Sequence, residues 1–172
     1  MTNSIDWPRV RRVLLICTGN ICRSPMAEGI LRAKLEEHGT DGILVESAGT
    51  HGGAIPEPSP PAVDVCLESG IDISNHRSRL LTGEMLREAD LVLFMDAGHE
   101  NWIARKHADL SPRTWPITAF RSDRYRNAEV ADPYGMPTSY YRRTYEMLDS
   151  SLDPIAHALA TGRWSEEELV ED

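Results

Sequence analysis

Short apolar runs alternate along the chain with longer stretches in which apolar residues recur every three or four positions. The runs at 13–16 and 91–95 are continuous, as in strands that are buried on both faces. A shorter, more polar run at 43–47 predicts a third strand. A fourth, around 115–118, contains Pro116, which has no N–H for a sheet ladder and therefore fits only at an edge. This alternation predicts an α/β fold, a parallel sheet with helices on both faces.

The longer stretches predict the helices that cover this sheet. The first spans about 25–38, with Ser24 as its N-cap and Pro25 at its first position. Further helices are expected at 59–69, 83–89 and 98–107. The last and longest follows apolar positions in alternating steps of four and three, at Tyr141, Tyr145, Leu148, Leu152, Ile155 and Leu159.

Two features of the C-terminal region bear on where its helices begin and end. Pro154 is expected to kink the last helix or to start a new segment capped by Asp153. Ser165 and Glu168 have the spacing of a capping box, so the acidic tail at 165–172 either forms a helical turn or is frayed.

Composition limits the kinds of partner. A chain of 172 residues with 41% hydrophobic residues suits a single domain, 1–172, with its core at about 11–161. The formal net charge of −9 argues against nucleic acid and anionic membranes as partners. The N-terminal segment lacks the pattern of a signal peptide, and no apolar run reaches about 18 residues. With only three cysteines, which favour a reducing compartment, we expect a soluble, cytoplasmic protein.

Eight residues, CTGNICRS at 17–24, separate the first strand from the first helix. Their backbone N–H groups should lie at a helix N-terminus, at the carboxyl edge of the sheet, where anions bind. Gly19 and Asn20 readily adopt positive φ, as a loop with converging amides requires. The guanidinium of Arg23 matches two oxygens of a tetrahedral oxyanion. The loop therefore predicts a phosphate site.

Cys17 gives this loop a nucleophile. Converging amides, the Arg23 guanidinium and the helix N-terminus favour its thiolate at neutral pH, and the Ser24 hydroxyl can donate to the sulfur. A thiolate below a phosphoryl group is placed for in-line attack, which gives a cysteinyl-phosphate intermediate. Zinc binding by Cys17 and Cys22 fails on spacing, because there is no second ligand pair. We expect neither a metal nor another cofactor.

The segment VLLICTGNICRSPMAEGIL at 13–31 resembles the phosphate-binding loop of the low-molecular-weight protein tyrosine phosphatases. The Asp-Pro-aromatic element of that family is matched by ADPYG at 131–135. VESAGT at 45–50 and GIDISNHRSRLLT at 70–82 also resemble family segments, so the match runs from about 11 to 161. The resemblance implies a flavodoxin-like sheet of order 2-1-3-4, with the loop at its topological switch point.

The resemblance also implies roles for individual residues. Cys17 would be the nucleophile, Arg23 the oxyanion clamp, and Asp132 the general acid and then base. Tyr134 would flank the pocket and stack on an aryl substrate, and His76 would hold the loop asparagine, with Ser78 where alanine is usual. The substrate-binding residues would include Thr18, Gly19, Asn20, Ile21, Cys22 and Ser24.

The family implies a redox role for Cys22, whose thiol would bond to oxidised Cys17 and shield it from irreversible oxidation. Cys66 shares a helical face with apolar residues and is expected in the core. The expected partners are phosphorylated proteins and a cognate tyrosine kinase; the oligomeric state stays open.

Four functions are compatible with a phosphate-binding loop of this kind and are weighed against one another. A phosphotyrosine phosphatase is favoured over a protein arginine phosphatase, in which a threonine usually stands at the position of Ile21, because an apolar residue suits an aryl ring. Gly53 stands about where many members place a wall tryptophan, which predicts a more open pocket. Arsenate reductase chemistry needs downstream thiols, and no cysteine follows Cys66. A non-catalytic phosphate-binding module would have no use for Cys17 opposite Asp132.

Overall fold

The computed structural model describes residues 4–166 of the chain. Four parallel strands form one sheet in the order β2-β1-β3-β4, which confirms the predicted flavodoxin-like order. The strands are β1 (Arg12–Cys17), β2 (Leu44–Gly49), β3 (Leu91–Phe94) and β4 (Thr114–Pro116). Pro116 ends the short edge strand β4, as its missing N–H predicts.

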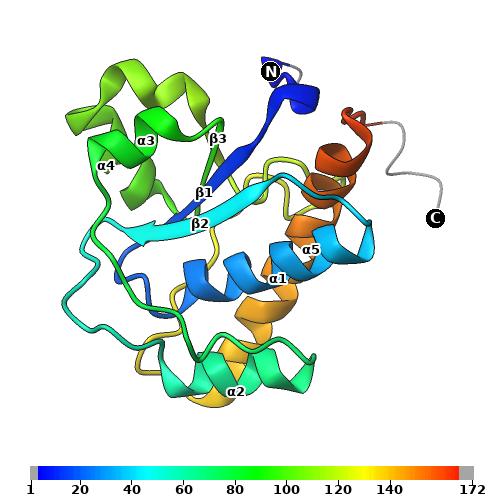
Figure 1. Ribbon diagram of the computed structural model, residues 1–172. Helices are drawn as coiled ribbons and strands as arrows, with labels where there is room; N and C mark the ends of the chain where they lie inside the picture. The colour runs from blue at the N-terminus through cyan, green and yellow to red at the C-terminus, as the bar shows by residue number, and fades with distance from the viewer. Residues whose placement is uncertain (1–3, 167–172) are drawn as a thin grey trace.

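Helices cover both faces of this sheet (Figure 1). One face carries α1 (Arg23–Glu37), α2 (Pro60–Glu68) and the long α5 (Thr138–Thr161). The other carries α3 (Gly83–Glu88) and α4 (Ala97–Lys106). Two short 3-10 helices, Trp7–Arg9 and Ala108–Arg113, were not expected from the sequence.

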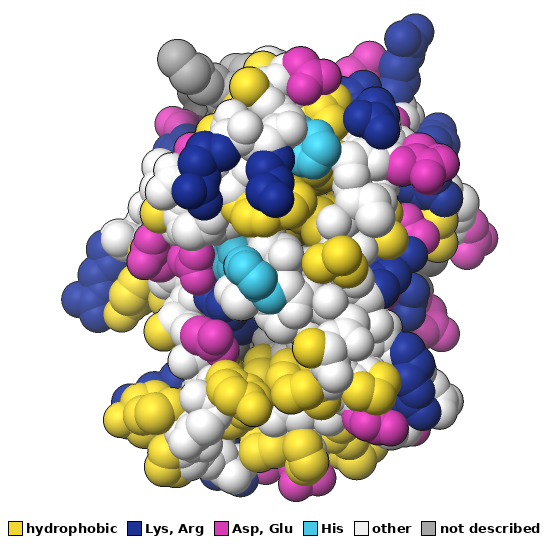
Figure 2. All heavy atoms as spheres, turned by 90° about the vertical axis from the view of Figure 1, so that its left-hand side faces the viewer, with side chains coloured by type: hydrophobic (Ala, Val, Ile, Leu, Met, Phe, Trp, Pro, Cys, Tyr) yellow, Lys and Arg dark blue, Asp and Glu magenta, His cyan; other side chains and the backbone are white. Residues whose placement is uncertain are grey.

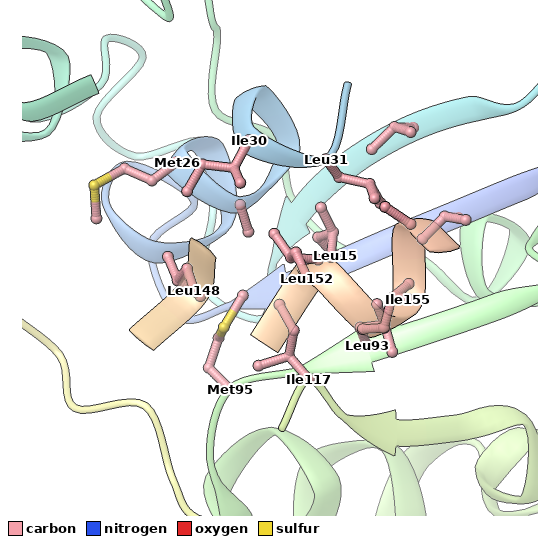
Figure 3. Packing of buried hydrophobic residues seen from close by; sticks show 14 of the residues in the cluster. Leu15, Met26, Ile30, Leu31, Leu93, Met95, Ile117, Leu148, Leu152 and Ile155 are labelled. Atoms are coloured by element: carbon pink, nitrogen blue, oxygen red, sulfur yellow. The ribbon is translucent and has the colours of Figure 1, made fainter. Parts of the chain in front are cut away.

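The strand β1 supplies both halves of the core, because its side chains alternate between the two faces. Leu15 packs with the apolar stripes of α1 and α5, among them Ile30 and Leu152 (Figure 3). Leu14 and Ile16 belong to the second cluster, under α3 and α4. Burial on both faces fixes the end of β1, and with it the position of Cys17.

Two expectations about helix ends are wrong. The helix α1 begins at Arg23 rather than after Ser24, and its N-cap residue is Cys22. Ser24 does not cap it because its hydroxyl is bound to Cys17 and Asn20. Of the two alternatives for Pro154, the new segment is wrong: α5 runs on to Thr161, since the fully buried Ile155 and its apolar neighbours hold it against the core, and a kink at Pro154 stays a prediction.

Asp153 is likewise not a cap. Its carboxylate lies 2.5 Å from Nζ of Lys34 and so links α5 to α1. Cys66 lies in the core as expected, fully buried, and burial raises the pKa of its thiol to about 12. Glu168 and most of the acidic tail lie outside the described residues.

Candidate active site

The loop at 17–22 leaves β1 at the carboxyl edge of the sheet and leads directly into α1. This edge faces the viewer in Figure 2, where hydrophobic side chains gather across the lower part of the surface. A pocket of about 270 Å³ opens here. It is lined by Cys17, Thr18, Gly19, Ile21, Cys22, Arg23, His51, Ile55, Asp132 and Tyr134. The structure thus brings together residues that are more than a hundred positions apart in the sequence.

The sulfur of Cys17 lies at the bottom of the loop, 2.9 Å from Oγ of Ser24. Oγ of Ser24 also accepts a hydrogen bond of 2.8 Å from Nδ2 of Asn20. With that acceptor position used, the hydroxyl proton of Ser24 is free to point at the sulfur. The Ser24 hydroxyl is therefore placed to donate a hydrogen bond to the sulfur of Cys17, next to the N-terminus of α1.

The first turn of α1 has no side-chain cap within the described residues. Helix N-termini leave backbone N–H groups without intrahelical partners, and these groups attract anions. Here they lie beside the side chains of Cys17 and Arg23. A tetrahedral oxyanion would therefore complete this helix end.

Asn20 fixes the curvature of the loop. Its φ of 57° is in the left-handed region; Gly19, for which positive φ was also expected, does not adopt it. The fully buried Asn20 side chain donates to Oγ of Ser47 at 2.9 Å and accepts from the backbone N–H of Arg79 at 3.0 Å. Its backbone oxygen lies 2.8 Å from Nε2 of His76. The structure thus places His76 against the loop asparagine, as the resemblance implied.

Gly49, at the end of β2, lets the loop pack closely against the sheet. A Cβ at this position would collide with the backbone oxygen of Thr18 and would lie 2.9 Å from the backbone nitrogen of Asn20. Both collisions are with backbone, so a side chain here would displace the loop. Gly49 and Ser47 were not predicted as site residues; their place at the carboxyl end of a predicted strand was the available signal.

Arg23 is 2% exposed, and protein groups orient its guanidinium. Nη1 donates to Oδ2 of Asp96 at 2.7 Å and to the backbone oxygen of Val130 at 3.0 Å. Nη2 donates to Oγ1 of Thr18 at 3.3 Å. Of the five N–H donors, three are thus bound by groups in residues 4–166, and two remain for an oxyanion.

Asp96, which the sequence analysis did not single out, is the counter-ion of this clamp. Burial opposes its ionisation, but the hydrogen bonds from Arg23 and from the N–H of Gly98, together with the positive charge nearby, outweigh burial, and the pKa of Asp96 is lowered. One residue, Met95, separates it from β3, and Cys17 ends β1, so the carboxyl edge of the predicted sheet was again the available signal.

Asp132 reaches the pocket from the loop before α5. Its side chain is 48% exposed, and Oδ2 lies 3.6 Å from Nη2 of Arg23. Oδ1 accepts from the backbone N–H of Tyr134 at 3.1 Å. Tyr134, 58% exposed, forms a pocket wall with Ile55. The carboxyl group thus lies beside the guanidinium, at the open side of the pocket.

The wall formed by the segment after β2 has no tryptophan. Gly53 is not among the pocket-lining residues, and His51 and Ile55 provide the wall instead. Ser78, where the family usually has alanine, holds this segment: its hydroxyl donates to the backbone oxygen of Ile55 and accepts from the N–H of Gly53. The change at position 78 therefore bears on the shape of the pocket.

Cys22 also lines the pocket, but its environment differs from that of Cys17. Its sulfur lies 3.6 Å from the hydroxyl of Tyr141, a buried residue of α5 that also bonds Ser59. Burial raises the pKa of the Cys22 thiol to about 11. At neutral pH Cys22 is therefore a thiol, held at the rear of the loop.

Metal ligands do not gather here. Residues 4–166 contain no group of three or more His, Cys, Asp or Glu side chains placed to hold a metal ion. Among the same residues, no helix has the length and apolar character required to cross a membrane.

Comparison with known proteins gives one consistent result. Residues 12–164 match the family model described as low molecular weight phosphotyrosine protein phosphatase. The chain is 34% identical over 148 residues to the low molecular weight protein-tyrosine-phosphatase Etp of Escherichia coli K12, covering 86% of this chain and 94% of that one. It is 35% identical over 150 residues to the protein-arginine-phosphatase of Geobacillus stearothermophilus, covering 87% and 97%.

A solved structure agrees with these relatives. The low molecular weight protein tyrosine phosphatase from T. tengcongensis superposes with a TM-score of 0.79 at 40% identity, covering 86% of this chain and 99% of that one.

Proposed function

Because the chain belongs to the low molecular weight phosphotyrosine protein phosphatase family, an enzyme family with a cysteine-based phosphatase fold, we propose that it hydrolyses phosphotyrosine in proteins. The observation that carries the proposal is the convergence of Cys17, Arg23 and Asp132 on one pocket with apolar walls. A nucleophile, an oxyanion clamp and an acid are the three groups that phosphate ester hydrolysis by a cysteine requires.

The reaction has two steps. The thiolate of Cys17 attacks phosphorus, the bond from phosphorus to the tyrosyl oxygen breaks, and the carboxyl group of Asp132 protonates the leaving oxygen. Asp132, now a carboxylate, takes a proton from water. That water attacks the cysteinyl phosphate, the phosphorus–sulfur bond breaks, and inorganic phosphate and the thiolate are released.

The other residues of the site bind and orient the phosphoryl group. The loop backbone from Thr18 to Arg23 and the first turn of α1 would surround its non-bridging oxygens. Asn20 and His76 would keep the loop in shape, and Ser24 would stabilise the thiolate both before attack and as the leaving group. Tyr134 would stack on the aryl ring.

Phosphoarginine is the competing substrate, since relatives of similar identity carry either name. Ile21 and Ile55 favour phosphotyrosine: apolar side chains suit an aryl ring, whereas a guanidinium would lose hydrogen bonds to water without gaining partners. The absence of a tryptophan from the wall leaves room for more than one substrate.

The test is the hydrolysis of a phosphotyrosine peptide, an aryl phosphate and phosphoarginine side by side, with EDTA present and Cys17→Ser as the blank. We expect kcat/KM for the phosphotyrosine peptide to exceed that for phosphoarginine by at least about tenfold, the effect of one unpaired polar group. Turnover of phosphoarginine alone would overturn the substrate assignment, and loss of activity with EDTA would overturn the mechanism.

A matched pair of variants sharpens this test. Ile21→Thr adds a hydroxyl to the pocket and should shift the ratio of the two kcat/KM values toward phosphoarginine. Ile21→Val has nearly the same shape without the hydroxyl and should leave the ratio unchanged. Equal ratios in both variants would show that position 21 does not set the preference.

Cys22 is proposed as the redox partner of Cys17. Peroxide would oxidise the Cys17 thiolate to a sulfenic acid, and the Cys22 thiol would then attack that sulfur, forming a disulfide and releasing water. Mass spectrometry of peroxide-treated protein should find the 17–22 disulfide. Sulfinic acid at Cys17 without it would contradict the proposal.

The site also bears on partners and location. A pocket open at Tyr134 suits a side chain on a protein surface, so we infer phosphorylated proteins as substrates and a tyrosine kinase as the source of the modification. Three free thiols, one of them the nucleophile, support a reducing location such as the cytoplasm. The net charge of −9 speaks against nucleic acid as a partner.

A further inference from the structure

A buried histidine contacts the phosphate loop from α4, and no role was predicted for it from the sequence. His99, at the third position of α4, is 2% exposed. Nδ1 accepts hydrogen bonds from the backbone N–H groups of Met95, at 3.3 Å, and Asp96, at 3.2 Å. The bond from the N–H of Asp96, together with the bond from the N–H of His99 to the Asp96 side chain, forms a capping box at the start of the helix.

The two bonds to Nδ1 determine where the imidazole carries its proton. A nitrogen that accepts two N–H groups is unprotonated, so the proton of neutral His99 is on Nε2. Nε2 lies 3.0 Å from Oγ1 of Thr18, to which it therefore donates. Burial, the main cause, lowers the pKa of His99 to about 4, so this donor stays neutral throughout the pH range of an ordinary assay.

Thr18 connects this donor to the clamp. Its Oγ1 accepts from Nε2 of His99 and, at 3.3 Å, from Nη2 of Arg23. Nη2 has a second potential partner, because Oδ2 of Asp132 lies 3.6 Å away. The anchored Thr18 oxygen takes one of the two N–H groups of Nη2 and so fixes the direction of the other, which faces the pocket on the side of Asp132.

We propose that His99 is a positioning residue: through the Thr18 hydroxyl it holds the Arg23 guanidinium in the orientation that binds the phosphoryl oxyanion. The inference rests on the proposed function and adds to it a chain of contacts from α4 to the clamp. Without the anchor, Nη2 turns toward Asp132, so oxyanion binding weakens and the acid is held as an ion pair.

Two substitutions separate this role from helix capping. Asn at 99 places its amide oxygen near the position of Nδ1, so His99→Asn keeps a cap acceptor and loses the donor to Thr18. Gln at 99 reaches as far as Nε2, so His99→Gln keeps a donor to Thr18 and loses the cap. If His99 acts only as a helix cap, His99→Asn should impair the protein less than His99→Gln. If His99 positions the clamp, His99→Gln should impair phosphate binding less than His99→Asn.

The readout is the affinity for inorganic phosphate, measured by calorimetry without turnover, together with kcat and KM on an aryl phosphate. We expect His99→Asn to weaken phosphate binding by about tenfold or more, the effect of a lost hydrogen bond to a charged group, with kcat also reduced. His99→Gln should bind within about twofold of wild type but melt at a lower temperature. The proposal would be overturned if His99→Asn bound phosphate as tightly as wild type. It would also be overturned if a folded His99→Gln bound phosphate as weakly as His99→Asn.

Thr18 supplies a test that does not alter the helix cap. Thr18→Val should weaken phosphate binding as much as His99→Asn does, Thr18→Ser should restore it, and the double variant Thr18→Val/His99→Asn should be no worse than Thr18→Val alone. Unchanged affinity in Thr18→Val would overturn the proposal even if the His99 variants failed to fold.

Thr82→Ala is the control for a lost cap alone. The Thr82 side chain accepts from the N–H of Met85 at the start of α3 and is not part of the pocket. We expect a lower melting temperature and unchanged phosphate binding. Failure of wild-type protein to bind phosphate at all would count against the proposed function, whereas equal binding in wild type, His99→Asn and Thr18→Val would count against the inference alone.

Discussion

The phosphate loop and the loop that carries Asp132 meet at one pocket but differ in burial. Asn20, Arg23 and the adjacent Ser24 are almost completely buried and bound by neighbouring groups. Asp132 and Tyr134 are about half exposed, and the Asp132 carboxylate accepts from the backbone N–H of Tyr134 and lies 3.6 Å from the Arg23 guanidinium.

The difference corresponds to two tasks. Donors aimed at a developing oxyanion are most effective when they need no reorganisation during the reaction, which a buried network provides. A general acid must reach the oxygens of differently shaped leaving groups and then a water molecule, which an exposed carboxyl group allows. We therefore expect substitutions in the phosphate loop to affect all substrates alike, and substitutions in the acid loop to discriminate among them.

The largest effect is expected for Cys17→Ser. Serine is a far weaker nucleophile at neutral pH, so kcat should fall by at least about 10⁴-fold on every phosphate ester. Steady-state rates on an aryl phosphate and a phosphotyrosine peptide measure this loss. Retained binding of inorganic phosphate is the control for folding, and residual activity above one per cent would contradict the assignment of the nucleophile.

Asp132→Ala should separate the two loops most clearly. Removing the acid should slow esters with poor leaving groups by about 10²–10⁴-fold but affect activated aryl esters much less, since these depart without protonation. The measurement is kcat against the pKa of the leaving group, which should become steeper. The same loss at every leaving group would show that Asp132 is not the acid.

The dependence of folding stability on pH should reveal the buried groups that support the phosphate loop. The pKa of His99 is about 4 in the folded chain and 6.5 in an unfolded one, so between these values only the unfolded chain takes up the proton. Stability is therefore lost as pH falls from 6.5 to 4, by up to about 3 kcal/mol from this residue. The lowered pKa of Asp96 adds a further loss at lower pH.

Urea unfolding at several pH values, for wild type and His99→Asn, measures this contribution. The free energy of unfolding of the variant should change less between pH 7 and 4.5. Parallel curves for the two proteins would show that His99 is not held neutral by burial.

The smallest effect is expected at the exposed edge of the acid loop. Tyr134→Ala should raise KM for a phosphotyrosine peptide by about threefold to tenfold, the value of one aromatic contact, with little change in kcat. Tyr134→Phe should behave like wild type. Tyr140→Ala is the matched control, since Tyr140 is 40% exposed but does not line the pocket; an equal effect at Tyr140 would remove stacking as the cause.

Sequence patterns predicted correctly those features that depend on a single helix or strand. The strand at 13–16, the edge position of Pro116 and the core position of Cys66 follow from apolar periodicity and from the chemistry of proline. Cys17 and Arg23 were singled out from the chemistry of the loop, and Asp132 from the resemblance to a family with a distinctive acid motif; the structure places all three at one pocket.

What the sequence did not predict depends on distances across the fold. Asp96 and His99 contact Arg23 and Thr18 from more than seventy residues away, and the only signal for them was the place of Asp96 after a predicted strand. Gly19 and Ser24 were misread for a related reason: the network around Asn20 and Cys17 decides the backbone angles and the helix start there, and it overrides local preference.

The short strand β4 has a consequence for self-association. An exposed strand edge recruits strands from other molecules by offering unpaired N–H and C=O groups. Here that edge is only three residues long and ends in proline, which offers no N–H, so it is a poor template for intermolecular strand addition. The opposite border, along β2, is also partly occupied: the backbone of Arg79 and Leu81 pairs with Gly49, and the side chains of Arg32 and Arg79 bind the backbone oxygens of Val45 and Ser47. Intermolecular strand addition is therefore disfavoured at both borders of the sheet.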